Sequence, residues 1–282
     1  MRLLKTNPVL WLAVALAAAC IFSPRISLAQ GNTPQPNALT GINANDEANV
    51  MQDQSLRETL GDPREEDAFK KFHIAEIPDK KVQLGEAFLN KYPLSHHAED
   101  VYQELAEALY AKKDMADFYT YSDKGIKLFP DDVVLLTMSG TVIPRAYDHN
   151  DPNADQRLDQ AEGYDKHAIE VVNSSARPAN MSDKQFSDYK ALELATAHSG
   201  LGLIYFRRGQ YDDSVKELQQ ATTGAANPDA TDLFVLGADF QSLNQFKQAA
   251  DAFGRCAQVA GSLQASCKQY ADQAAKQAAQ AQ

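Results

Sequence analysis

Apolar residues recur three and four positions apart along most of the chain beyond Glu65, with polar residues between them. This spacing places the apolar side chains on one face of an α-helix. Pro, Asp and Asn residues interrupt the pattern, and strand-like alternation is scarce. Helix starts are marked by Ser95, by Asp131 and by a capping box formed by Ser182 and Gln185. The pattern predicts an all-α fold with helices of about a dozen residues or a little more.

Two segments repeat the same residue types, LGLIYFRRGQYDDSVKELQQA (201–221) and LGADFQSLNQFKQAADAFGRCA (236–257). Gly202 and Gly237 hold the same place, at a spacing close to the ~34 residues of helix–turn–helix repeats. A glycine inside a helix costs ~1 kcal/mol relative to alanine, so we expect close helix packing to compensate for it. The side chains that fill the seam between the helices are expected to be Leu201, Tyr205, Tyr211 and Leu218, with Leu236, Phe240, Phe246 and Phe253 at the corresponding positions.

Both segments resemble tetratricopeptide repeats, which carry Leu-Gly and an aromatic residue in the first helix and a small-then-bulky pair, here Ala249 and Phe253, in the second. An earlier unit with Leu105-Ala106 in the Leu-Gly place ends at Pro130 and resembles the family less closely. The resemblance implies a right-handed α-solenoid of helical hairpins with a C-terminal capping helix. The expected domain is 63–282, with pairs at about 63–94, 96–130, 132–172, 183–226 and 229–260 and the capping helix at 262–280.

The first 29 residues have the features of a secretory signal peptide: a basic start, a short apolar run, and small residues at Ser27 and Ala29. The apolar run is shorter than the ~20 residues that span a bilayer. Cleavage near Ala29 predicts a periplasmic or secreted protein without an integral membrane segment. The alternative is a lipoprotein anchored through Cys20. Residues 30–62 are rich in Asn, Gln, Pro and Gly and predict a disordered linker.

The chain carries 27 basic and 38 acidic residues, a formal net charge of −11, and it has no basic cluster. Nucleic acids and anionic membrane surfaces attract clustered Lys and Arg, so neither is an expected partner. Cys256 and Cys267 remain after the leader. In an exported chain they either form a disulfide or stay as two buried thiols, and both alternatives are open.

No motif for catalysis stands out. Gly200-Leu201-Gly202 is not a dinucleotide loop, because Tyr205 stands where a further glycine is required and a helix-forming segment precedes it. Neither G-x-S-x-G nor H-E-x-x-H occurs. His96 and His97 are adjacent, and adjacent helical side chains point about 100° apart, so we expect them not to share a metal ion. The sequence therefore predicts no enzyme, no cofactor and no metal site.

The resemblance implies a concave groove, lined by the first helix of each pair, that binds peptides or helices of partner proteins. Of its members, Leu203, Phe206 and Phe234 form either an exposed apolar patch or, in part, the core. The predicted function is a non-catalytic protein-interaction scaffold, and the alternative is an envelope-assembly or cell-wall accessory lipoprotein. Partners are expected to be proteins, and no sequence feature specifies an oligomeric state. The groove residues are Tyr110, Arg145, Leu203, Phe206, Arg207, Phe234 and Gln241.

Overall fold

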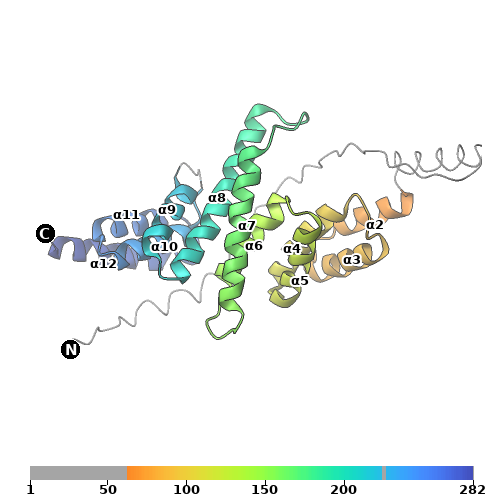
Figure 1. Cartoon of the computed structure of the whole chain (residues 1–282). Helices are drawn as coiled ribbons and strands as arrows, with labels where there is room; N and C mark the ends of the chain where they lie inside the picture. The colour runs from red at the N-terminus through yellow and green to blue at the C-terminus, as the bar shows by residue number, and fades with distance from the viewer. Residues whose placement is uncertain (1–61, 224–226, 282) are drawn as a thin grey trace, which may run out of the picture. The chain divides into compact units, whose positions relative to one another are not determined.

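The computed structural model describes residues 62–223 and 227–281. These residues form eleven α-helices and no strand, which confirms the predicted all-α class for this part of the chain (Figure 1). The predicted leader, and the predicted linker up to residue 61, lie outside the described residues. The described residues divide into two compact units, with the boundary between Leu135 and Leu136.

The first unit contains α2 (Pro63–His73), α3 (Pro78–Lys91), α4 (Ala98–Lys112) and α5 (Met115–Leu128), and each packs against the next. Proline begins α2 and α3, at a position where its missing N–H has no helical partner to lose. Phe72 and Phe88 are fully or almost fully buried and pack together with Val101 of α4. A shared apolar cluster therefore joins α2, α3 and α4.

The second unit begins within α6 (Val133–Arg145) and is helical to its end. Ser182 and Gln185 form the predicted capping box at the start of α8. The helices α7 and α8 contain 21 and 25 residues and lie side by side (Figure 1), so they are longer than the sequence pattern predicted. No proline interrupts either helix, and packing between the two helices stabilises the added turns. The remaining helices are α7 (Ala154–Ser174), α8 (Asp183–Arg207), α9 (Tyr211–Thr222), α10 (Ala230–Ser242), α11 (Phe246–Cys256) and α12 (Gln264–Gln280).

The two repeat glycines lie where consecutive helices touch. A Cβ atom at Gly202 of α8 would lie 2.5 Å from Cγ of Leu218 in α9, and one at Gly237 of α10 would lie 2.7 Å from the Phe253 ring in α11. Both distances are too short for a carbon–carbon contact. The missing side chain is therefore what allows each first helix to approach its second helix, as the sequence predicts.

Three hairpin turns share one backbone geometry, which links the α4–α5 pair to the two clearer repeats. The turn residue has a left-handed backbone each time, with φ of 62° at Lys113, 72° at Gly209 and 60° at Asn244. The next backbone N–H then donates to a carbonyl in the preceding helix, a usual way to end a helix. These bonds join Asp114 to Leu109 (3.0 Å), Gln210 to Tyr205 (2.9 Å) and Gln245 to Phe240 (2.7 Å).

Gly200 faces a neighbouring helix as well. Asp165 of α7 is fully buried, and a Cβ atom at Gly140 of α6 or at Gly200 of α8 would lie 1.9 or 2.0 Å from its carboxyl oxygens. Burial raises the pKa of Asp165 well above its ordinary value, and Glu217 adds to the rise. The uncharged carboxyl is thus favoured in the space left by the two glycines. Gly200 and Gly202 both serve helix packing.

A second buried carboxyl, Asp239 of α10, contacts Ser214 of α9. The Ser214 hydroxyl lies 2.8 Å from the Gly202 carbonyl and 2.6 Å from Oδ2 of Asp239. The single hydroxyl proton of Ser214 lies within reach of both acceptors, and Ser214 is the donor in each contact. Burial raises the pKa of Asp239 to about 8, although the bond from Ser214 opposes the rise. Burial therefore favours a neutral Asp239 carboxyl in spite of the bond from Ser214.

A disulfide joins α11 to α12. Cys256 and Cys267 are both fully buried and bonded, with their Cα atoms 5.6 Å apart. Of the two alternatives open from the sequence, the structure has the disulfide. None of the helices in the described part of the chain combines the length and apolar character needed to cross a bilayer.

Candidate binding surfaces

Arg145, predicted to line the partner groove, takes part in a polar network inside the second unit. Its guanidinium lies 3.0 Å from a carboxyl oxygen of Asp229 and 3.7 Å from one of Asp232, and Ser199 donates to Asp232 at 2.8 Å. Burial raises the pKa of Asp232, and the neighbouring Asp229 adds to the rise. Burial acts the same way on Asp229, but the ion pair with Arg145 leaves its pKa lowered. Arg145 thus compensates buried acids within the chain.

The three predicted groove residues at the end of α8 are largely engaged within the same unit. Leu203 is 4% exposed and belongs to the hydrophobic core, and the half-buried Phe206 packs against that core. Arg207 donates from Nε to the Pro144 carbonyl at 2.9 Å, and its guanidinium lies 5.6 Å from the centre of the Tyr147 ring. Of the two alternatives left open by the sequence, Leu203 takes the core one, because this side of α8 faces the α9–α10 core.

Two further groove residues, on α10, are in contact with α12. Phe234 is 8% exposed, and its ring centre lies 5.4 Å from that of Tyr270. Gln241 donates from Nε2 to the side-chain oxygen of Gln277 at 3.1 Å. Phe234 also takes the core alternative, because α12 packs over this face of α10. The inward orientation left open by the sequence is the observed one for Leu203 and Phe234.

Tyr110, the remaining predicted groove residue, belongs to the first unit. It lies near the end of α4, is half-buried, and its ring centre is 6.1 Å from that of Phe118 in α5. The other six predicted groove residues all belong to the second unit. Five of the seven lie on α8 and α10, two helices that contact each other.

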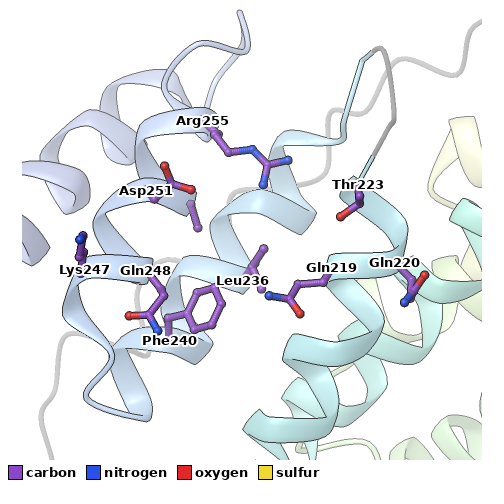
Figure 2. A pocket seen from close by; sticks show the side chains of 10 residues that line it. Gln219, Gln220, Thr223, Leu236, Phe240, Lys247, Gln248, Asp251 and Arg255 are labelled. Atoms are coloured by element: carbon purple, nitrogen blue, oxygen red, sulfur yellow. The ribbon is translucent and has the colours of Figure 1, made fainter.

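A pocket of about 560 Å³ opens on a different face of the second unit, between α9 and α11 (Figure 2). Leu236 and Phe240 of α10, which were predicted only as structural repeat residues, lie between these two helices in the view. Polar side chains from the second helices of two successive pairs flank them. The lining consists of Gln219, Gln220, Thr223, Leu236, Phe240, Lys247, Gln248, Asp251, Ala252 and Arg255.

This α9–α11 pocket combines an apolar floor with a polar rim. Leu236, Phe240 and Ala252 are buried, whereas most of the polar lining side chains are exposed. Arg255 reaches across to donate to the Thr222 carbonyl at 3.1 Å, which fixes one end of the pocket. The sequence did not predict this pocket, because the groove implied by the resemblance is lined by the first helix of each pair. The available signal was the run of amide side chains on the second helices.

His96 and His97 do come together, contrary to the sequence argument. They lie in the turn before α4, where the helical spacing assumed for them does not apply. Nε2 of His97 is 3.0 Å and Nε2 of His96 is 3.5 Å from the same oxygen, Oε1 of Glu66 in α2. The sequence offered no signal for this group, because Glu66 is distant along the chain.

The second unit and the α4–α5 pair define the chain as an all-α protein built from helical hairpins like those of tetratricopeptide repeats (TPR), with a C-terminal helix. No protein-family model matches the sequence, and no curated protein matches it. One similar solved structure is that of a thermophilic TPR protein of Thermus thermophilus, which is 15% identical. The match covers 70% of this chain and 90% of that one, with a TM-score of 0.49. The hairpin assignment itself rests on the glycine contacts and turn geometry of this chain.

Proposed function

We propose that the chain is a non-catalytic scaffold that binds a segment of a partner protein in the α9–α11 pocket. The observation that carries the proposal is the pairing of an apolar floor with an amide-rich rim in that pocket. An amide side chain both donates and accepts, so Gln219 and Gln248 can bond the backbone of an extended or turned peptide. The floor formed by Leu236 and Phe240 would take an apolar side chain of that peptide.

The face of α8 and α10 that carries the predicted groove residues is a weaker candidate for the partner-binding surface of this unit. Arg145 and Arg207 are held by internal partners, and Leu203 and Phe234 are buried. A partner would have to displace these contacts before it gained new ones, and that cost reduces affinity. Partner binding by the second helices needs no such rearrangement.

Site-specific photo-crosslinking tests this proposal. A photoreactive amino acid replaces Gln248 at the pocket rim in the full chain, and the matched control replaces Gln269, which is exposed on α12. We expect the Gln248 position, and not the control, to crosslink a defined segment of a partner protein. A synthetic copy of that segment should then bind the purified chain. The double change Gln219→Ala with Gln248→Ala should weaken binding about thirtyfold, the effect of losing two hydrogen bonds of ~1 kcal/mol each.

Equal crosslinking at both positions would argue against the pocket as the binding surface.

Catalysis is a separate alternative: substrate turnover by the purified chain, abolished by one His or Asp substitution, would replace the scaffold proposal with an enzyme.

We also propose that the protein is exported and works as a soluble periplasmic or secreted protein. The basic and apolar pattern of residues 1–29 supports export, and so does the Cys256–Cys267 disulfide, because disulfides persist mainly in oxidising compartments. Mass spectrometry of the native N-terminus tests the proposal. A chain that starts at Gln30 is expected. A lipid-modified Cys20 at the N-terminus would support the envelope lipoprotein instead.

A further inference from the structure

We propose that Glu66, His96 and His97 bind a divalent transition-metal ion such as Zn²⁺. Among the described residues, this group brings one carboxylate and two imidazoles close enough to share an ion, with all three ligand atoms within 4.8 Å of one another. Both histidines point Nε2 at the same carboxylate oxygen, at 3.5 Å from His96 and 3.0 Å from His97. Nitrogen and carboxylate ligands in this combination suit Zn²⁺.

The distances from Glu66 to the two imidazole nitrogens fit tetrahedral coordination. Zn²⁺ lies about 2.0–2.2 Å from imidazole nitrogen and carboxylate oxygen, so two ligand atoms on one ion are about 3.4 Å apart. The distances from Glu66 to the two histidines lie on either side of that value. His96, with 65% of its side chain exposed, has room to rotate and bring its nitrogen to the ion.

Neighbouring side chains prepare both rings. His97 is 15% exposed and stacks on Phe69, with ring centres 3.8 Å apart and planes 5° apart, so its direction is fixed. On the far side of His96, Oε1 of Glu65 lies 3.9 Å from Nδ1. That oxygen is buried and has no hydrogen-bond partner in the described part of the chain. A metal-bound histidine usually donates its other N–H to a carboxylate, and Glu65 would accept it once rotation of the exposed His96 ring shortens this distance.

A plain ion pair accounts for less of this geometry. His198 lies 2.6 Å from Glu217 in the second unit, as a histidine–carboxylate pair with one imidazole. The Glu66 group differs because a second imidazole nitrogen is directed at the same carboxylate oxygen. A shared metal ion explains the convergence. Three protein ligands leave one position for water, and the ion would join the first turn of α2 to the turn before α4.

Calorimetric titration with Zn²⁺ tests the site on the full chain after removal of metal by a chelator. We expect one Zn²⁺ per chain at the site. His96→Ala or Glu66→Gln should weaken its affinity at least about 100-fold, and Glu65→Gln should weaken it about tenfold, as is typical of a residue that orients a ligand. His198→Ala is the matched control and should leave the affinity unchanged.

Titration with Co²⁺ gives a second measurement that does not depend on stability. Its visible absorption reports coordination by nitrogen and oxygen, and we expect the band in the original chain and its loss in His96→Ala. Circular dichroism of each variant checks folding, and replacement of the exposed His96 should preserve it. Absence of Zn²⁺ binding, equal affinity in the original chain and the His96→Ala and Glu66→Gln variants, or an equal loss in His198→Ala would each overturn the proposal.

Discussion

Replacing Gly202 with alanine tests the packing that defines the hairpins. The new Cβ would lie 2.5 Å from Cγ and 3.3 Å from the backbone nitrogen of Leu218, whereas ordinary contacts begin at 3.4 Å. Leu218 is fully buried and cannot swing into solvent. Because its backbone nitrogen is also too close, α9 itself has to move away from α8.

The magnitude follows from two opposing effects. Overpacking a core typically costs about 1–3 kcal/mol, and exchanging a helical glycine for alanine stabilises a helix by ~1 kcal/mol. Gly254 of α11 provides the matched control, because a Cβ there meets no atom within 4 Å and only the stabilising effect remains. Both variants gain the same stabilisation from replacing a helical glycine with alanine, so this gain cancels in the comparison. Gly202→Ala should therefore be about 1–3 kcal/mol less stable than Gly254→Ala, with an unfolding midpoint roughly 2–12 °C lower.

Circular dichroism during heating measures this difference, and both glycines lie in the second unit, so one transition reports both variants. A Leu218→Ala background identifies the cause. Without Cγ and Cδ at residue 218, Gly202→Ala should lose most of its penalty, and the coupling between the two sites measures the clash. Equal melting temperatures for the Gly202→Ala and Gly254→Ala variants would refute the close-packing argument.

Three further outcomes are expected. Because the folded protein holds the Asp239 proton up to pH about 8 and the unfolded chain releases it near pH ~3.9, stability should fall as pH rises through that window, and Asp239→Asn should flatten the dependence of the urea midpoint on pH. An unchanged slope in Asp239→Asn would show that other groups cause the dependence. Replacing Cys256 and Cys267 with serine should cost about 3 kcal/mol by freeing the loop between them in the unfolded chain, and a thiol assay on the denatured protein should find neither cysteine free. Phe234→Ala should lower stability by about 3–5 kcal/mol, since the ring packs against both Phe253 and Tyr270, and a stability change below 1 kcal/mol would contradict its place in the core.

The sequence by itself determined the features that depend on neighbours along the chain. Helical periodicity, the Ser182–Gln185 cap and the spacing of Gly202 and Gly237 are local, since each involves residues of one hairpin or of its copy. The same holds for the turn at Gly209, where the left-handed backbone suits a residue without a Cβ atom. Such features can be read from residue types because the physical cause and the residue lie within a few turns of helix.

Only the tertiary structure decided which side chains face other helices. Phe234 is core because α12 packs over it, and α12 carries no sequence mark of where it docks. His96 and His97 converge on Glu66 because the turn before α4 meets the first turn of α2. A residue's own neighbours fix its backbone, but its burial, its charge state and its partners depend on helices that arrive from elsewhere in the chain.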